Sequence, residues 1–353
     1  MAVAQALRES DAAAAVLLVG RRGGIEETLV PAAGLDLETL DVRGIDTTRP
    51  LGMVGAMLRL PRAVARARRI IHRFAPDIVV GAAGYVCVPV VLAARSQRVP
   101  VVLMEQNALP GRAVRRLAKR SQAVAVSFAG TKQLLPGARV VHTGNPVRPE
   151  VIAALPAPRR ERCGHLLIMG GSQGARRIND AVAGGIHHLL EANPELVVTH
   201  SCGTRDADWS IPVRAGLPEE IRERYTVAAW FDDIAERIRD ADLVLMRAGG
   251  SSLAEVSVLG RAMILVPYPY AGAHQNANAS AYVEAGAAMV VPDEELSAVR
   301  LREEVERLLH DEARWRAMSD ASVRSGVPDA TDRVIALLHD VLAEHRRGHG
   351  AAA

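Results

Sequence analysis

Short apolar runs rich in β-branched residues alternate with longer stretches of helical periodicity along the chain. Most of these runs are continuously apolar, which is typical of strands covered by helices on both faces. The succession of strand, helix and strand predicts parallel sheets. The expected strands lie within Ala14–Gly20, Asp77–Gly84, Pro100–Asn107, Ala123–Phe128, Ala138–Gly144, His165–Gly171, Leu196–Gly203, Tyr225–Trp230, Asp242–Gly249 and Ala262–Pro267.

A proline-rich segment, residues 145–160, separates the earlier strands from the later ones. We therefore predict an α/β protein with two Rossmann-like domains that face each other across a cleft. Residues 1–146 would form the first domain and residues 147–340 the second, with residues 341–353 as a disordered tail after a helix that begins near Thr331. Because ligands bind beyond the carboxyl ends of parallel strands, we expect a composite site between the domains.

Composition limits the number and kind of hydrophobic cores but does not locate a binding site. A chain of 353 residues can bury two cores, and only 3% of its residues are aromatic, so we expect both cores to be aliphatic. Nearly all the positive charge is arginine, since Lys119 and Lys132 are the only lysines. Arginine suits bidentate recognition of phosphate, but a bias this general does not locate a binding site.

Cysteine spacing and hydropathy bear on the compartment. Cys87, Cys163 and Cys202 form no CxxC pair or Cys/His cluster, so neither a zinc site nor a disulfide framework is favoured. Widely spaced cysteines fit a reducing cytoplasm. No apolar run approaches the ~20 residues of a spanning helix, and the chain does not open like an export signal. Any contact with a membrane is therefore expected at its surface.

Two glycine-rich segments each follow an expected strand and open a helix. Residues 170–175 (GGSQGA) would let a phosphate approach a helix N-terminus, with Ser172 as a hydroxyl donor. The segment is not GxGxxG, so a plain tight turn remains an open alternative. Residues 247–255 (RAGGSSLAE) repeat the device. Glu255 there would accept hydrogen bonds from a ribose or simply complement the helix dipole.

Polar residues also end other expected strands. Glu105 would orient or deprotonate an incoming hydroxyl, whereas Asn107 would alternatively cap the next helix. The loop that contains Tyr85 ends the preceding strand and should lie beside them. Near Gln275 and Asn278, several amides offer both donors and acceptors to sugar hydroxyls, or else form an ordinary polar helix start.

Two charged features favour structural explanations. Asp232 and Asp233 are adjacent acids at an expected helix start, where capping is favoured over metal binding. Five arginines repeat every three or four residues and would form one stripe of a helix: Arg59, Arg62, Arg66, Arg69 and Arg73. Such a stripe can bind an anionic membrane, although a solvated face is the commoner explanation.

Taken in order, six segments of the chain resemble the MurG family of glycosyltransferases. They are GAAGYVCVP (81–89), MEQNALPG (104–111), TGNPVR (143–148), GGSQGA (170–175), RAGGSSLAE (247–255) and HQNANA (274–279). The resemblance covers nearly the whole chain. It implies a two-domain GT-B fold that needs no cofactor and no bound metal. It also implies inverting transfer of N-acetylglucosamine from UDP-N-acetylglucosamine to undecaprenyl-pyrophosphoryl-N-acetylmuramyl-pentapeptide.

The resemblance further implies roles for individual residues, most of them in binding the UDP-sugar. The implied donor-site residues are Ser172 (diphosphate), Glu255 (ribose) with Gly250, Ser251, Ser252, Leu253 and Ala254 beside it, Gln275 (sugar hydroxyls), Phe231 (uracil, through its backbone), Arg148 (from the hinge) and Asn107 (from the first domain). Tyr85 and Glu105 would line the acceptor side, and Glu105 is the candidate catalytic base.

The resemblance places the protein at the cytoplasmic face of the plasma membrane as a peripheral enzyme. The implied partners are the lipid acceptor, an anionic membrane surface and other cell-wall synthesis enzymes, with no nucleic acid. The family normally opens with a strand and a GGTGGH-type loop, whereas residues 1–7 here already resemble the following helix. We therefore expect the true start upstream, or a truncated product, with the first strand missing and neighbouring strand edges exposed.

Two other functions remain open from the sequence. The missing loop removes the family's histidine, so the chain could be an inactive remnant that only binds a sugar nucleotide. A UDP-N-acetylglucosamine epimerase would have a similar architecture and would need no lipid acceptor. The acceptor-side residues Tyr85 and Glu105 favour transfer over epimerisation.

Overall fold

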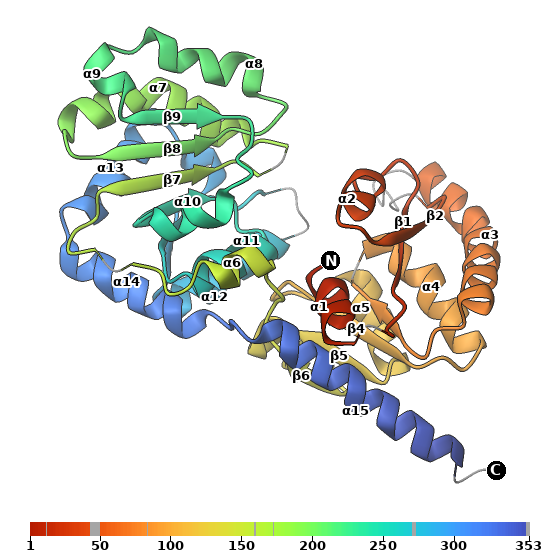
Figure 1. Ribbon diagram of the computed structural model, residues 1–353. Coiled ribbons are helices and arrows are strands. Elements are labelled where there is room, and N and C mark those ends of the chain that lie inside the picture. The colour runs from red at the N-terminus through yellow and green to blue at the C-terminus, as the bar shows by residue number, and fades with distance from the viewer. Residues whose placement is uncertain are drawn as a thin grey trace. The chain divides into compact units, whose positions relative to one another are not determined.

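In the computed structural model, the described residues are 1–11, 13–42, 50–82, 84–158, 160–171, 173–269 and 273–350, without the side chains of 50–59 and 349–350. The chain divides into two compact units (Figure 1). The first unit comprises Met1–Pro146 with Asp329–Ala353, and the second comprises Val147–Pro328. Each unit contains parallel sheet with helices packed against it, so the predicted two-domain α/β fold is confirmed.

The strands of the first unit form two parallel sheets. β1 and β2 pair with each other, and the second sheet has the order β3-β4-β5-β6. Within the described residues, β1, β2, β3 and β6 each have a single strand neighbour. The bounds are β1 (Leu17–Arg21), β2 (Asp36–Leu40), β3 (Val79–Gly81), β4 (Val101–Glu105), β5 (Ala123–Val126) and β6 (Val140–His142).

Helices cover both faces of the β3–β6 sheet. The helices of the first unit are α1 (Ala2–Ser10), α2 (Glu26–Ala32), α3 (Pro50–Phe74), α4 (Gly84–Ser96), α5 (Arg112–Leu117) and α15 (Ala330–Gly350), with 3-10 turns at Ala118–Arg120 and Ala129–Leu134. Of these, α2 packs against β1 and β2 instead. Along β4, Val101 and Leu103 join the core that includes α3 and α4, whereas Val102 joins the core under α15. Both faces of the strand are buried, which explains its continuously apolar sequence.

The C-terminal helix α15 corrects the predicted domain limits. Residues 329–340 were expected in the second domain, but α15 lies against β5 of the first unit (Figure 1). Its buried residues Val334, Leu337 and Val341 belong to the same hydrophobic core as Ala125 of β5. The predicted disordered tail is also wrong as far as Gly350, because α15 continues to that residue. Residues 351–353 lie outside the described part.

The described part of the second unit forms a six-stranded parallel sheet with the order β12-β11-β10-β7-β8-β9. The chain enters at β7, moves outward through β8 and β9, and returns to β10 on the other side of β7. The strand order therefore reverses between β7 and β10. The bounds are β7 (His165–Met169), β8 (Val197–Ser201), β9 (Tyr225–Ala228), β10 (Leu243–Met246), β11 (Ala262–Leu265) and β12 (Ala288–Val290).

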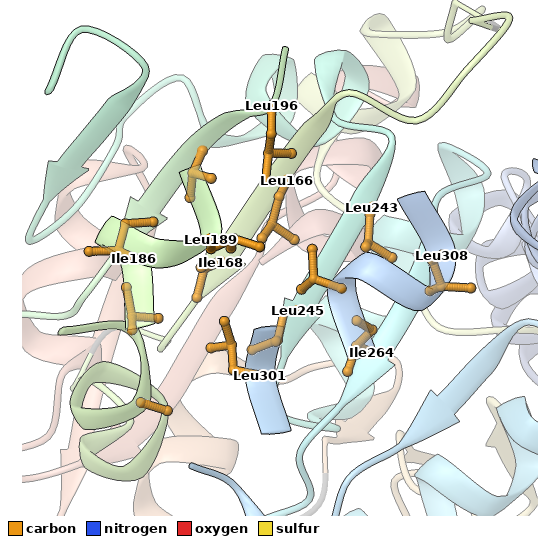
Figure 2. Close-up of a cluster of buried hydrophobic side chains, with 14 of the residues drawn as sticks. Leu166, Ile168, Ile186, Leu189, Leu196, Leu243, Leu245, Ile264, Leu301 and Leu308 are labelled. Atoms are coloured by element: carbon orange, nitrogen blue, oxygen red, sulfur yellow. The ribbon is translucent and has the colours of Figure 1, made fainter. Parts of the chain in front are cut away.

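An aliphatic core holds this sheet to its helices (Figure 2). The helices are α6 (Pro149–Ala153), α7 (Arg176–Ala192), α8 (Ala207–Ser210), α9 (Glu219–Arg222), α10 (Ile234–Asp240), α11 (Gly250–Val258), α12 (His274–Glu284), α13 (Ala298–Leu309) and α14 (Glu312–Ser325), with 3-10 turns at Ile211–Gly216 and Asp293–Glu295. Leu166 of β7 packs with Leu189 of α7 and Leu308 of α13. The aliphatic core expected from the sequence is confirmed for this unit.

Candidate active site

A pocket of about 890 Å³ lies at the carboxyl end of the second unit's sheet. Every strand of that sheet contributes a residue at or just beyond its end. These residues include Met169 and Gly170 (β7), Ser201 (β8), Trp230 and Phe231 (β9), Met246 (β10), Tyr268 (β11) and Asp293 (β12). The pocket therefore includes the point where the strand order reverses, which is the usual ligand site of such sheets.

Positive charge predominates on the pocket lining. Five arginines line it: Arg148, Arg176, Arg177, Arg205 and Arg247. Three carboxylates accompany them: Asp180, Glu255 and Asp293. An excess of guanidinium groups around a helix N-terminus suits a phosphorylated ligand.

The glycine-rich loop after β7 is both a tight turn and part of the pocket. Gly171 and Gly174 have φ values of 73° and 86°, which favour glycine. A Cβ added to Gly174 would lie 2.7 Å from the carbonyl oxygen of Cys202, so the loop touches its neighbour. α7 begins at Arg176 directly after the loop. Ser172, whose hydroxyl was predicted to donate a hydrogen bond to the diphosphate, lies outside the described residues.

Arg148 and Glu255 form a bidentate ion pair on the pocket wall. Nε of Arg148 donates to Oε1 of Glu255 at 2.7 Å, and Nη2 donates to Oε2 at 2.8 Å. Burial lowers the pKa of Arg148, but the hydrogen bond and charge of Glu255 outweigh burial and raise it overall. Both carboxylate oxygens predicted to meet a ribose are thus held by a guanidinium.

Glu105, in the first unit, closes its own loop. Its side chain is buried; Oε1 accepts from the backbone N–H and the Nδ2 of Asn107, both at 3.0 Å. Oε2 accepts from the backbone N–H of Gly111 at 2.8 Å. The residue that caps α5 is Gly111, so the alternative role of Asn107 as a cap is wrong. The catalytic role of Glu105 stays a prediction. The hydrogen bonds by which it holds this loop were not predicted from the sequence.

Comparisons with known proteins agree across the whole chain. Residues 1–126 match the glycosyltransferase family 28 N-terminal domain, and residues 165–334 match the family's C-terminal domain. A Syntrophotalea carbinolica protein named UDP-N-acetylglucosamine--N-acetylmuramyl-(pentapeptide) pyrophosphoryl-undecaprenol N-acetylglucosamine transferase is 36% identical, covering 98% of this chain and 95% of that protein. A protein of the same name from Nitratidesulfovibrio vulgaris is 38% identical, covering 97% and 93%.

Comparison with a solved structure leads to the same family. The crystal structure of Acinetobacter baumannii MurG superposes with a TM-score of 0.74 at 26% identity, covering 96% of this chain and 94% of that one. The chain belongs to the MurG family of glycosyltransferases. A UDP-GlcNAc 2-epimerase from Neisseria meningitidis, with a TM-score of 0.66 at 14% identity, shares the fold alone.

Within this MurG-family site, the structure separates the predicted donor residues. Arg148, Phe231, Ser252, Glu255 and Gln275 all line the pocket. The lining does not include Gly250, Ser251, Leu253 or Ala254, which surround Ser252 and Glu255 on α11. Leu253 is fully buried and belongs to the interior of the unit.

Phe231, Gln275 and Asn278, which were singled out in the sequence, each contact a partner within the second unit. The guanidinium of Arg237 lies 4.3 Å from the centre of the Phe231 ring. Oε1 of Gln275 accepts from the backbone N–H of Tyr268 at 2.9 Å. Asn278 is fully buried and its Nδ2 donates to the carbonyl of Ala248 at 3.0 Å, so it holds α12 in place and is not a sugar ligand.

Tyr85, predicted to line the acceptor side, is 54% exposed and is the second residue of α4. β3 and β4 pair in parallel, with Gly81 opposite Leu103. The loops after these strands are therefore neighbours, as predicted. This confirms the expected proximity of the segments that contain Tyr85 and Glu105, but not their chemical roles.

The two charged features singled out in the sequence have defined surroundings in the structure. Asp233 occupies the N-cap of α10, yet its carboxylate pairs with Arg237 at 3.0 Å instead of capping the backbone. The described residues contain no cluster of metal-ligating side chains, and none of their helices is long and apolar enough to span a membrane. On α3, Arg62, Arg66, Arg69 and Arg73 are exposed. Arg66 and Arg73 pair with Glu38, and the Arg59 side chain lies outside the described part.

Several pocket residues were not predicted. The arginines at 176, 177, 205 and 247 were hidden by the general abundance of arginine. For Arg176 and Arg177, a usable signal existed, because they directly follow the glycine-rich loop and so fall in the first turn of a helix. Asp293 had no such signal. It lies after the three-residue strand β12 and accepts a hydrogen bond from Arg247 at 2.5 Å.

Proposed function

We propose that this chain transfers N-acetylglucosamine from UDP-N-acetylglucosamine to undecaprenyl-pyrophosphoryl-N-acetylmuramyl-pentapeptide. The observation that carries the proposal is the pocket where the second unit's strand order reverses, with a glycine-rich loop, five arginines and Glu255 on its lining. These groups match the parts of a sugar nucleotide, which is an anionic diphosphate between two hydroxyl-bearing rings. The names of the relatives support the same substrates.

The donor would lie along the pocket from the glycine-rich loop toward α12. Its diphosphate would meet the N-terminus of α7, where free N–H groups and Arg176 supply positive charge. Its ribose hydroxyls would donate to Glu255, with Phe231 near the uracil and Gln275 near the sugar hydroxyls. Because Arg148 holds both oxygens of Glu255, the ribose must share or displace that ion pair.

The reaction would be one displacement at the anomeric carbon. The acceptor hydroxyl attacks from the face opposite the diphosphate, and a new C–O bond forms as the bond to the phosphate oxygen breaks. UDP leaves with the bonding electron pair, the hydroxyl proton passes to a base, and the configuration inverts. Charge accumulates on the departing diphosphate, so fixed N–H groups and guanidinium groups beside it would lower the barrier.

The acceptor's lipid chain places this reaction at a membrane surface, which we propose is the cytoplasmic face of the plasma membrane. The exposed arginines of α3 support such binding, since each basic residue near an anionic surface contributes about 1 kcal/mol. Tyr85 and Glu105 remain the candidate acceptor-side residues, with Glu105 as the candidate base. Contacts with other cell-wall synthesis enzymes are also part of the proposal.

Release of UDP in the presence and absence of a soluble acceptor analogue tests the proposal. We expect release that depends on the acceptor, in step with a disaccharide product. Conversion of the donor to its 2-epimer without acceptor would favour the epimerase instead. UDP binding without any turnover would favour the inactive remnant, and either result would contradict transfer.

A further inference from the structure

A chain of buried polar side chains runs beneath the glycine-rich loop. Tyr225, His200 and Asn179 come from β9, β8 and α7, and their exposures are 1%, 0% and 0%. The hydroxyl of Tyr225 lies 2.9 Å from Nδ1 of His200, and Nε2 of His200 lies 2.9 Å from Oδ1 of Asn179. Nδ2 of Asn179 donates at 2.8 Å both to the carbonyl of Cys202 and to Oδ2 of Asp206.

The two acceptors bonded to Asn179 determine which atom donates in every hydrogen bond of this row of side chains. Because Nδ2 of Asn179 donates twice, its Oδ1 can only accept from His200. Nε2 of His200 must therefore carry the proton, and its Nδ1 must accept from the hydroxyl of Tyr225. Burial lowers the pKa of His200 to about 4 and raises the pKa of Tyr225, so both groups stay neutral near pH 7. A single arrangement of protons satisfies every member.

This row of hydrogen-bonded side chains joins two loops that both contribute residues to the pocket lining. Gly174 belongs to the loop after β7, and Gly203 belongs to the loop after β8. A Cβ on Gly203 would lie 2.0 Å from the backbone nitrogen of Gly174, so the two backbones are in direct contact. Asn179 sits in the first turn of α7 and bonds to Cys202 and Asp206 of the second loop. Its amide therefore ties the start of α7 to the loop after β8.

We propose that Asn179 and His200 are positioning residues that hold these two loops in the shape that receives the donor's diphosphate. Neither residue lines the pocket, and both are fully buried, so they would act through the loops without touching the ligand. The inference rests on the proposed donor site. It concerns how the site is built, because a loop displaced by even a fraction of an ångström loses hydrogen bonds to phosphate.

A matched control lies at the other end of the same helix. Asn193 follows α7 at its C-terminus, is buried, and donates to the carbonyl of Leu189 at 2.8 Å and to Glu306 at 3.2 Å. It resembles Asn179 in burial and in bonding to one carbonyl and one carboxylate. At 1.5 Å per residue, it is about 21 Å from Asn179 and the pocket loops.

The test compares Asn179→Ala with Asn193→Ala in the full chain, with UDP as the probe in isothermal titration calorimetry. We expect N179A to bind UDP about tenfold more weakly, the effect of losing roughly one buried hydrogen-bonded contact, and N193A to bind within about twofold of wild type. Both should unfold at lower temperature. The KM for the UDP-sugar should rise with the dissociation constant in N179A, with kcat changed less. Equal affinity of N179A and wild type, or equal losses in the two variants, would overturn the inference.

Milder variants keep the test decisive where N179A does not fold. Tyr225→Phe removes only the hydroxyl that donates to His200, and His200→Leu removes both ring nitrogens, whereas His200→Gln keeps one donor and one acceptor. We expect UDP affinity to fall in the order wild type, H200Q, Y225F, H200L. If both Y225F and H200L bind UDP with wild-type affinity, the inference is overturned but the proposed function is not. Absence of UDP binding by the wild type would instead overturn the proposed function and the inference with it.

Discussion

At the scale of single residues, the ion pair between Arg148 and Glu255 decides how a ribose can bind. Both oxygens of Glu255 are engaged by the guanidinium, whose side chain is 42% exposed. The partly exposed guanidinium can move aside, although the bidentate geometry and the 12% exposure of Glu255 make this pair stronger than an ordinary surface ion pair. The pair therefore orients Glu255 on the pocket wall and leaves it within reach of a ligand.

We expect Glu255→Ala to weaken UDP binding by about tenfold or more, because a hydrogen bond to a charged group contributes about 1.5–3 kcal/mol. The variant should also lose any preference for UDP over 2′-deoxy-UDP, which calorimetry measures directly. Glu284→Ala, at the exposed end of α12, is the control and should bind like wild type. A preference for UDP that survives in E255A would show that Glu255 does not meet the ribose.

Glu105 should matter for stability as well as for any chemistry. In Glu105→Gln, the neutral amide offers a donor where three N–H donors now find acceptors. We expect the free energy of unfolding to fall by about 1–3 kcal/mol, as for a buried unsatisfied group. Glu344→Gln, which breaks an exposed pair with Arg139, should change it by less than about 1 kcal/mol. An E105Q variant as stable as wild type but inactive would favour a purely catalytic role.

His200 makes stability depend on pH. Its pKa is lowered from 6.5 to about 4 in the folded chain, so the unfolded chain takes up a proton that the folded chain refuses. The free energy of unfolding should therefore decrease as pH falls from 6.5 to 4, by about 3 kcal/mol at 1.36 kcal/mol per unit. Denaturant unfolding of wild type and His200→Gln measures this, and the difference between them should shrink as pH falls. A constant difference between pH 7 and pH 4 would contradict it.

The residues that sequence reasoning found and missed differ in what surrounds them. Glu255 and Gln275 follow strand ends and glycine-rich turns, so their position in a parallel sheet could be predicted. His200 stands between Thr199 and Ser201, and Asn179 stands beside Asp180, so nothing in the local sequence marks either residue. Their partners lie 21 to 27 positions away. Only the pairing of β8 with its neighbours reveals that they form one chain.

At the scale of elements, the contact between the two pocket loops depends on glycine. Gly203 has a φ of 80°, and a Cβ there would lie 2.0 Å from the backbone nitrogen of Gly174. We expect Gly203→Ala to lower the free energy of unfolding by more than about 2 kcal/mol and to abolish measurable UDP binding, because the loops must separate. Gly216→Ala is the control, since nothing lies within 4 Å of its added Cβ. Wild-type binding by G203A would show that the loop contact does not shape the pocket.

Every segment expected to form a strand contains one, and the two unexpected strands show the limit of that approach. β2 reads DLETL, in which three of the five residues are polar, so it does not form a continuous apolar run. β12 has only three residues, as do β3 and β6, so its length alone does not explain why it was missed. Both lie at the outer end of a sheet, where one strand neighbour suffices.

At the scale of the whole molecule, the sequence predicted the division after Pro146 but not the return of the chain to the first unit. Helix α15 follows the second unit in sequence, and its amphipathic pattern does not say which sheet it covers. Its partners Val102 and Ala125 lie more than 200 positions earlier. Contacts of that separation leave no local signal.

This assignment predicts separate effects on the two units. Leu337→Ala should lower the stability of the first unit by about 2–4 kcal/mol, the usual cost of truncating a buried leucine. The affinity for UDP should stay unchanged, because the pocket residues all belong to the second unit. Leu308→Ala, in the core of the second unit, is the matched variant and should destabilise that unit instead. Loss of UDP affinity in L337A at a temperature where it is folded would contradict the assignment.

The most direct test of the proposed function is transfer of labelled N-acetylglucosamine from its UDP donor to a soluble analogue of the muramyl lipid, by the 353-residue chain as printed. We predict a labelled disaccharide of inverted anomeric configuration, formed only with acceptor present and lost in Glu255→Ala at low donor concentration. A folded wild-type chain that binds UDP yet leaves the acceptor unlabelled would contradict the proposal that this chain is a transferase.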